Sequence, residues 1–182
     1  MRSIFKAAFA LAVLALPAVS HAQKMVGGAE MYPTKDIIDN AVNSKDHTTL
    51  VAAVKAAGLV ETLKGKGPFT VFAPTNEAFA ALPAGTVDML LKPENKTKLV
   101  AILTYHVVAG NMTGMELSKM IKAGNGKAEL TTVAGGKLTV SMSGKDVMVK
   151  DAAGNSAKVT IADVMQSNGV IHVVNKVLMP GM

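Results

Sequence analysis

The apolar positions follow two different periods along the chain. Between residues 34 and 103 they recur mostly every three or four positions in short runs, which predicts a series of helices. From Gly126 onward they alternate with polar residues, and clusters such as Ala134-Gly135-Gly136 separate the runs as hairpin turns do. A helical first half followed by an antiparallel second half is typical of an α+β domain.

Three residues are predicted to mark helix ends. Thr34 can cap the first helix, and Thr113 and Glu116 have the spacing of a capping box. Gly58 stands where the residue after a helix belongs.

Three other runs are rich in β-branched and aromatic residues and are predicted to be strands. The first runs from Phe69 to Ala73 and ends at Pro74. The second runs from Thr104 to Val108. The third, Gly169 to Met179, is almost continuously apolar, as a strand buried on both faces would be. Because we find neither an internal repeat nor a linker, we expect one domain.

The N-terminus has the pattern of a cleavable signal peptide. Arg2 and Lys6 precede an apolar stretch from Ala7 to Val19, and the small residues of Ser20-His21-Ala22 predict cleavage before Gln23. A retained membrane anchor is the competing interpretation. It is disfavoured because a bilayer span needs roughly 20 apolar residues.

This cleavage site sets the expected boundaries: a signal peptide at 1–22, a tail of weak pattern at 23–33, and the domain at 34–182. We therefore expect a secreted or periplasmic protein without stable membrane insertion. The sequence contains no cysteine, so disulfides and a lipid-attachment cysteine are excluded. The domain has to be held by its core, and a chain of this size can bury about two-thirds of its unfolded surface.

The charged residues argue against nucleic acid as a partner. The chain has 19 basic and 13 acidic residues, but its only arginine, Arg2, lies in the predicted signal peptide. Arginine is the side chain best suited to bidentate contacts with phosphates and base edges. Aromatic residues, on which bases could stack, make up only 4% of the chain. A lysine-rich solvated surface is the simpler interpretation.

Three segments together resemble the signature of the fasciclin domain family. They are Phe69-Thr-Val-Phe-Ala-Pro-Thr-Asn-Glu-Ala-Phe79, then Tyr105-His106 within Leu-Thr-Tyr-His-Val-Val, and Gly169-Val-Ile-His-Val-Val-Asn-Lys-Val-Leu178. The resemblance extends from about Asp36 to Pro180. It implies a wedge of two β-sheets flanked by helices, with the first and third segments paired near its centre. Asn76 and Asn175 stand where family members often carry aspartate.

The resemblance implies a binding module that acts in cell-surface or extracellular-matrix adhesion, with a protein or polysaccharide partner. Tyr105 and His106 match the pair through which animal members engage integrins, and they are the candidate binding residues. Adjacent strand residues point to opposite faces, so we expect one of the two in the core and the other at the surface. The alternative is that both only stabilise the fold, each with a satisfied hydrogen bond.

Enzyme signatures are absent from the sequence. It contains no Gly-x-Ser-x-Gly elbow, His-Glu-x-x-His pair, phosphate loop or dinucleotide fingerprint. His172 lies in an apolar run and is expected to be a neutral core histidine, whereas His47 beside Asp46 is expected to be exposed. The histidines do not have metal-ligand spacing. We predict no catalytic residue, metal ligand or cofactor.

A carrier for a small ligand is the rival hypothesis. Such a protein would hold an apolar molecule, or a soft metal such as Cu(I), in a cleft between helices and sheet. Thioethers suit Cu(I), and Met112 and Met115 are spaced as Met-x-x-Met, while Met25 and Met31 lie in the expected tail. Methionine also fills irregular gaps in protein cores, which is the simpler explanation.

Overall fold

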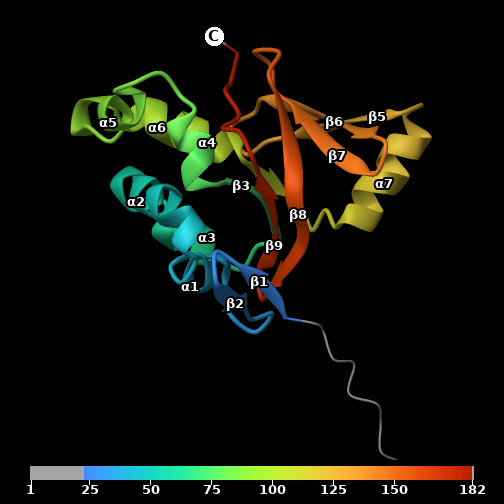
Figure 1. Cartoon of the computed structure of the whole chain (residues 1–182), viewed down its shortest axis with the longest axis horizontal. Helices are drawn as coiled ribbons and strands as arrows, with labels where there is room; N and C mark the ends of the chain where they lie inside the picture. Colours follow the sequence, from blue (N-terminus) through green and yellow to red (C-terminus); the bar gives the residue numbers. More distant parts are fainter. Residues whose placement is uncertain (1–22, 182) are drawn as a thin grey trace, which may run out of the picture.

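The computed structural model describes residues 23–181, so the predicted signal peptide lies outside the described residues. Figure 1 shows a curved sheet with most helices gathered on one side of it. The elements are, in order, β1 (Lys24–Val26), β2 (Ala29–Met31), α1 (Ile37–Ala41), the 3-10 turn η1 (Lys45–His47), α2 (Thr48–Ala57), α3 (Val60–Lys64), β3 (Phe69–Pro74), α4 (Asn76–Ala80), α5 (Thr86–Leu90), η2 (Pro93–Asn95), α6 (Lys96–Tyr105), β4 (Val107–Ala109), α7 (Gly114–Ala123), β5 (Lys127–Thr131), β6 (Lys137–Ser143), β7 (Asp146–Lys150), β8 (Ser156–Gln166) and β9 (Gly169–Val174).

Strands β3 and β9 form a parallel pair inside the main sheet, with Phe69 opposite Gly169 and Pro74 opposite Val174. This confirms the expected pairing of the first and third sequence segments. Both strands are buried almost throughout. A parallel pair covered on both faces needs apolar side chains in both directions, which explains the uninterrupted apolar run in β9.

The main sheet has seven strands in the order β4-β3-β9-β8-β7-β6-β5. It curls until its two edges approach each other. Val108 of β4 pairs with Thr132 just beyond β5, and the amide of Val133 donates to the carbonyl of Val107 at 2.8 Å. This closure leaves little free edge at that corner. The α+β class is confirmed, and the sheet is close to a barrel.

The apolar side chains form two cores on opposite faces of the central strands. Val71 of β3 and Ile171 of β9 pack against the helices α1 to α4 and α6. Phe72 of β3 and Val174 of β9 pack on the other face, in the interior of the curled sheet, with Leu117 of α7. One parallel strand pair therefore supports both halves of the molecule.

Two expectations for the N-terminal part need correction. The segment expected to be a tail contains the hairpin β1–β2, in which Val26 and Met31 are buried against the helical core. The two strands on either side of Gly27-Gly28 are too short to show an alternation of apolar and polar residues, so the hydrophobic pattern did not reveal the hairpin. The first helix, α1, is capped by Asp36 and not by Thr34. The Asp36 side chain accepts a hydrogen bond from the amide of Asp39 at 2.8 Å.

Other local expectations are confirmed. Thr113 caps α7 by accepting from the amide of Glu116 at 3.3 Å, as its capping-box spacing predicts. Gly58 ends α2 in the left-handed conformation, with φ of 72°, as expected of the residue after a helix.

The close approach of β3 and β9 predicts the effect of adding a methyl group at Gly169. A Cβ there would overlap the carbonyl oxygen of Phe69, so the strands would have to separate. We expect Gly169→Ala to lower the free energy of unfolding by about 3 kcal/mol, the upper range for overpacking. Urea denaturation measures this change. Gly144→Ala is the control, because Gly144 has φ of 64° and open space around it, so only backbone strain of about 1 kcal/mol applies. Equal losses in the two variants would contradict the packing explanation.

Candidate functional site

Tyr105 and His106 lie where α6 ends and β4 begins. The predicted strand from Thr104 is wrong at its start, because α6 continues through Tyr105 and His106 is its C-cap. Leu99, Ile102 and Leu103 face the helical core at helical spacing, and this packing outweighs the local preference for a strand. The two side chains therefore do not divide between core and surface.

Both members of the pair are buried, with 0% of Tyr105 and 2% of His106 exposed. The Tyr105 hydroxyl donates to the carbonyl of Lys137 at 2.7 Å and accepts from the amide of Ala152 at 2.9 Å. It thereby joins the start of β6 to the turn between β7 and β8. The ring lies against Gly136, where a Cβ would come within 2.6 Å of the tyrosine Cε2.

The imidazole of His106 bridges the helix and the C-terminal segment. Its Nδ1 lies 2.8 Å from the carbonyl of Ile102 and therefore carries the proton as a donor. Its Nε2 accepts from the amide of Leu178 at 2.9 Å, a role that only the neutral ring can fill. Burial lowers the pKa of His106 from 6.5 to about 4, and the Ile102 carbonyl and the charge of Asp151 offset part of this effect.

Asp151 completes this arrangement and was not singled out in the sequence. It is 5% exposed, and its carboxylate accepts from the amide of Met179 at 2.9 Å and from the amide of Asn155 at 2.8 Å. The only sequence signal was its position before the turn residues Ala153-Gly154-Asn155, which is also typical of an ordinary turn. We call Tyr105, His106 and Asp151 the buried junction.

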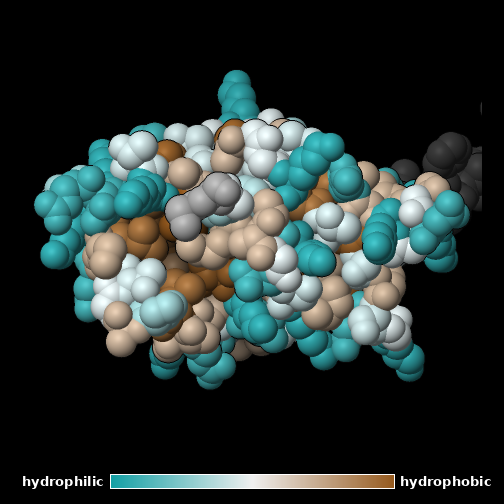
Figure 2. All heavy atoms as spheres, turned by 90° about the horizontal axis from the view of Figure 1, so that it is seen from above, coloured by the Kyte–Doolittle hydropathy of each residue, from teal (hydrophilic) through white to brown (hydrophobic). Residues whose placement is uncertain are grey.

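The buried junction holds one end of the molecule together. It fixes the turn between β5 and β6, the turn between β7 and β8, and the segment after β9, all by hydrogen bonds to backbone groups. Figure 2 looks onto the end that carries the C-terminus. Hydrophobic residues gather in the left part of this view, on the side where Figure 1 places α2 and α6, and hydrophilic residues surround them.

Two other polar residues of the three segments, His172 and Asn76, also have structural partners. His172 is fully buried, and its Nε2 lies 2.7 Å from the carbonyl of Met112, which confirms a core histidine bonded to backbone. Burial lowers its pKa. Asn76 donates to the carbonyl of Lys45 and accepts from the amide of Thr49. A carboxylate could not make the first bond, which suits asparagine at this position.

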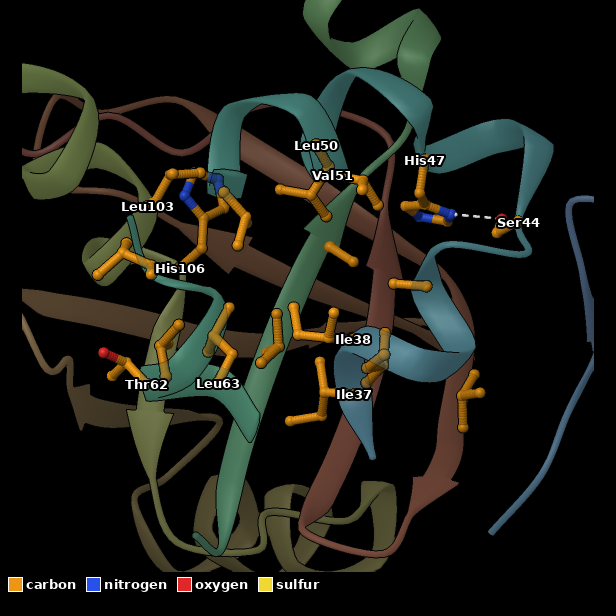
Figure 3. A pocket seen from close by; sticks show the side chains of 18 of the residues that line it. Ile37, Ile38, Ser44, His47, Leu50, Val51, Thr62, Leu63, Leu103 and His106 are labelled. Carbon is orange, nitrogen blue, oxygen red and sulfur yellow. Dashed lines mark hydrogen bonds between the residues drawn. The ribbon is translucent and has the colours of Figure 1, made fainter. Parts of the chain in front are cut away.

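An apolar cavity of about 60 Å³ lies between the helical layer and the central strands. His106 and Leu103 line one side of it, and His47 lines another (Figure 3). The expectation that His47 is exposed is wrong, since only 4% of the residue is accessible. The turn η1 directs the ring inward, where Nδ1 lies 2.8 Å from the hydroxyl of Ser44.

The two methionines of the Met-x-x-Met pair lie in different environments. Met112 packs partly buried against the sheet interior, whereas Met115 is 68% exposed on α7. Within residues 23–181, the histidine, aspartate and glutamate side chains form no cluster of three or more that could hold a metal ion. In the same range, none of the helices is both long and apolar enough to cross a membrane.

A curled seven-stranded sheet, flanked by helices and held at one end by a buried tyrosine–histidine pair, defines the class of α+β domain to which this protein belongs. The sequence matches the fasciclin domain over residues 45–180. The chain belongs to the fasciclin domain family.

Two relatives and one solved structure illustrate this membership. Protein sll1483 of Synechocystis is 53% identical over 146 residues, which cover 80% of this chain and 74% of the relative. Transforming growth factor-beta-induced protein ig-h3 of Sus scrofa is 41% identical over 149 residues, 81% of this chain but 20% of the relative. The FAS1 domain pair of the insect cell adhesion molecule fasciclin I aligns with a TM-score of 0.71 at 17% identity, covering 80% of this chain and 51% of that one, and shows the shared fold.

Removal of the Tyr105 hydroxyl should destabilise the domain. Tyr105→Phe leaves the carbonyl of Lys137 and the amide of Ala152 without their partner, and an unpaired buried group costs on the order of 1–3 kcal/mol. We expect a loss of about 2 kcal/mol in the free energy of unfolding, measured in urea. The chain's other tyrosine, Tyr32, bonds Glu30 at the surface, so Tyr32→Phe should change stability by less than about 0.5 kcal/mol. Similar effects of the two changes would contradict the assigned role.

The low pKa of His106 predicts a pH dependence of stability. Between pH 6.5 and about 4 the unfolded chain binds a proton at this residue and the folded chain does not. Stability should therefore fall as the pH falls through this window, by about 3 kcal/mol from His106, and level off below it. Chemical denaturation at several pH values, compared with His106→Gln, isolates this contribution from those of His47 and His172. Parallel pH profiles of the two proteins would contradict the shifted pKa.

Proposed function

We propose that this chain is an exported binding module that mediates cell-surface or extracellular-matrix adhesion through a protein or polysaccharide partner. Membership in the fasciclin domain family supports the binding role, and the solved relative is named as a cell adhesion molecule. The N-terminal pattern supports secretion to the periplasm or beyond, with cleavage near Ala22-Gln23.

The observation that carries the proposal is the fixed end of the sheet. The buried junction holds two turns and the C-terminal segment by backbone hydrogen bonds, so their relative positions are set before a partner arrives. A preorganised surface does not spend binding free energy on ordering its loops. A domain without disulfides needs such internal bonds to present turns in one arrangement.

Tyr105 and His106 enter this proposal as residues that position the contact surface. Their side chains are buried, so a partner would meet the turns above them, at residues 132–136 and 151–155. Gly136 and Gly154 add no side chain to these turns. Lys137 beside the first turn is exposed. Loss of either buried side chain would let the turns move and would weaken binding.

The test is a binding measurement with the immobilised protein. Envelope and matrix fractions from the producing organism are passed over it, with aliquots first digested by a protease or by glycosidases to identify the class of partner. We expect saturable binding by the wild type. Tyr105→Phe should weaken it by about ten-fold, since 1.4 kcal/mol of lost preorganisation corresponds to that factor.

Tyr32→Phe is the matched control, because it removes the other tyrosine hydroxyl of the chain at a distant exposed site. It should bind like the wild type. Circular dichroism and a melting curve establish that each variant is folded at the assay temperature. If Tyr105→Phe binds the partner as tightly as the wild type does, the buried junction does not position the binding surface. Absence of saturable binding by the wild type would contradict the adhesion function itself.

A further inference from the structure

Strands β5 to β8 present a polar outer face, in the part of the sheet that lies farthest from α2, α5 and α6 (Figure 1). Leu138, Val140 and Val149 are fully buried in the interior of the curled sheet. Because side chains alternate along a strand, the residues between them point outward. The side chains in these outward positions include four lysines and two hydroxyl-bearing residues: Lys127, Lys137, Lys150, Lys158, Thr139 and Ser141.

Three of these lysines form a diagonal row across neighbouring strands. Lys150 of β7 lies opposite Thr139 of β6, and Lys137 is two residues before that threonine. On the other side, Lys158 of β8 lies opposite Met148, which is two residues before Lys150. Neighbouring strands are about 4.8 Å apart and two residues advance a strand by about 6.8 Å, so successive lysines are roughly 8 Å apart at their Cα atoms. We call Lys137, Lys150 and Lys158 the lysine row.

The charges of the lysine row are accessible to an anionic partner. In the part of the chain that the structure describes, Lys150 takes part in no ion pair. Lys137 pairs with Glu129 and Lys158 pairs with Asp146, but each of these four side chains is at least 44% exposed. An exposed ion pair contributes only about 0.2–1 kcal/mol. An anionic group of a partner can therefore replace either carboxylate with a small loss of stability.

The acidic residues of this half of the chain do not cancel its positive charge. Residues 127–181 contain six lysines and four acidic residues. Two of the four acidic side chains are engaged inside the domain, since Asp151 belongs to the buried junction and Asp163 accepts from the amide of Gly114 at 2.6 Å. The other two are Glu129 and Asp146, whereas none of the six lysines is buried. The surface of these strands is therefore cationic and suits an anionic partner.

The chemistry of the face selects among anionic partners. A lipid surface calls for apolar side chains that insert between the headgroups, but the lysines are separated by Thr139, Ser141 and the half-buried Met148. Nucleic acid is disfavoured because the chain's only arginine, Arg2, lies in the predicted signal peptide. A second copy of the same face would bring like charges together. Hydroxyl groups between cations match a polymer that carries both hydroxyls and negative charges.

We propose that the lysine row binds an acidic polysaccharide, a chain of sugars that carries carboxylate or sulfate groups. These groups meet the lysines, while the hydroxyls of Thr139 and Ser141 donate to and accept from sugar hydroxyls. The row adjoins the turns 132–136 and 151–155, because Lys137 follows the first turn and Lys150 precedes the second. The inference rests on the proposed adhesion function, in which those turns contact the partner, and it assigns the partner to one chemical class.

The test measures binding of the purified protein to three defined polymers by isothermal titration calorimetry. Alginate carries carboxylates, dextran sulfate carries sulfates, and dextran is neutral. We expect saturable binding of at least one acidic polymer and no binding of dextran, and the acidic polymer that binds identifies the charged group. Raising the salt from 50 to 200 mM should weaken this binding about ten-fold, since roughly three lysines replace counterions of the polymer.

Two triple variants separate the lysine row from the net charge of the protein. The first replaces the row (Lys137→Gln, Lys150→Gln, Lys158→Gln). The control removes three exposed lysines from α2 and α6 (Lys55→Gln, Lys96→Gln, Lys98→Gln) and so has the same net charge. An exposed charge contact is worth roughly a factor of two, so the row variant should bind about ten-fold more weakly than the wild type. The control should lose less than about two-fold.

Three results would overturn the proposal. They are an absence of saturable binding to both acidic polymers, equal binding of neutral dextran, and equal weakening in the two triple variants, which would show that only net charge matters. Failure of the adhesion function would be a different result. If the row variant still binds the envelope or matrix fractions as the wild type does, the adhesion function stands and the lysine row is not its site. Circular dichroism establishes that both variants are folded.

Discussion

The buried junction imposes a constraint that much of the fold has to satisfy. A tyrosine hydroxyl, an imidazole and a carboxylate are costly to bury unless each has its hydrogen-bond partners. Here the partners are backbone groups of Lys137, Ala152, Leu178 and Met179, which lie far apart in the sequence. Satisfying them brings the end of α6, two hairpin turns and the C-terminal segment to one place. In a chain without cysteine, this network performs the joining that disulfides provide in many exported domains.

The same constraint relates structure to function. The parallel pair β3–β9 serves both cores, and the curled sheet brings β4 close to the end of β5, so the turns at this end rest on a rigid base. The tyrosine–histidine pair that resembles a binding motif is buried under those turns. In the proposed adhesion function, the pair would therefore act on a partner without contacting it, by fixing the turns that the partner meets. The cavity near His47 lies between the helical layer and the central strands and is a separate feature of the domain.

The sequence allowed the class, the buried character of β9 and two helix ends to be predicted, because each rests on local chemistry, whereas the pairing of the two central strands was implied by the family resemblance. Continuous apolar character marks β9, and Gly58 marks the end of α2. The errors arose where tertiary packing decides. Thr104 and Tyr105 favour a strand by propensity, but the core contacts of Leu99, Ile102 and Leu103 extend the helix. His47 was expected at the surface, because a sequence does not show which way a 3-10 turn directs its side chains. Asp151 was missed because its partner Met179 is 28 residues away.

The central claim is that the buried junction locks the C-terminal segment and the β7–β8 turn into the cooperative core. Native-state hydrogen exchange of the amides of Leu178 and Ala152 tests it most directly, because His106 and Tyr105 are their acceptors. The account predicts that both amides exchange only through global unfolding, with the same free energy as the amides of β3 and β9. Exchange through local opening, at a much lower free energy than the central strands, would show that these segments fray independently and would contradict the account.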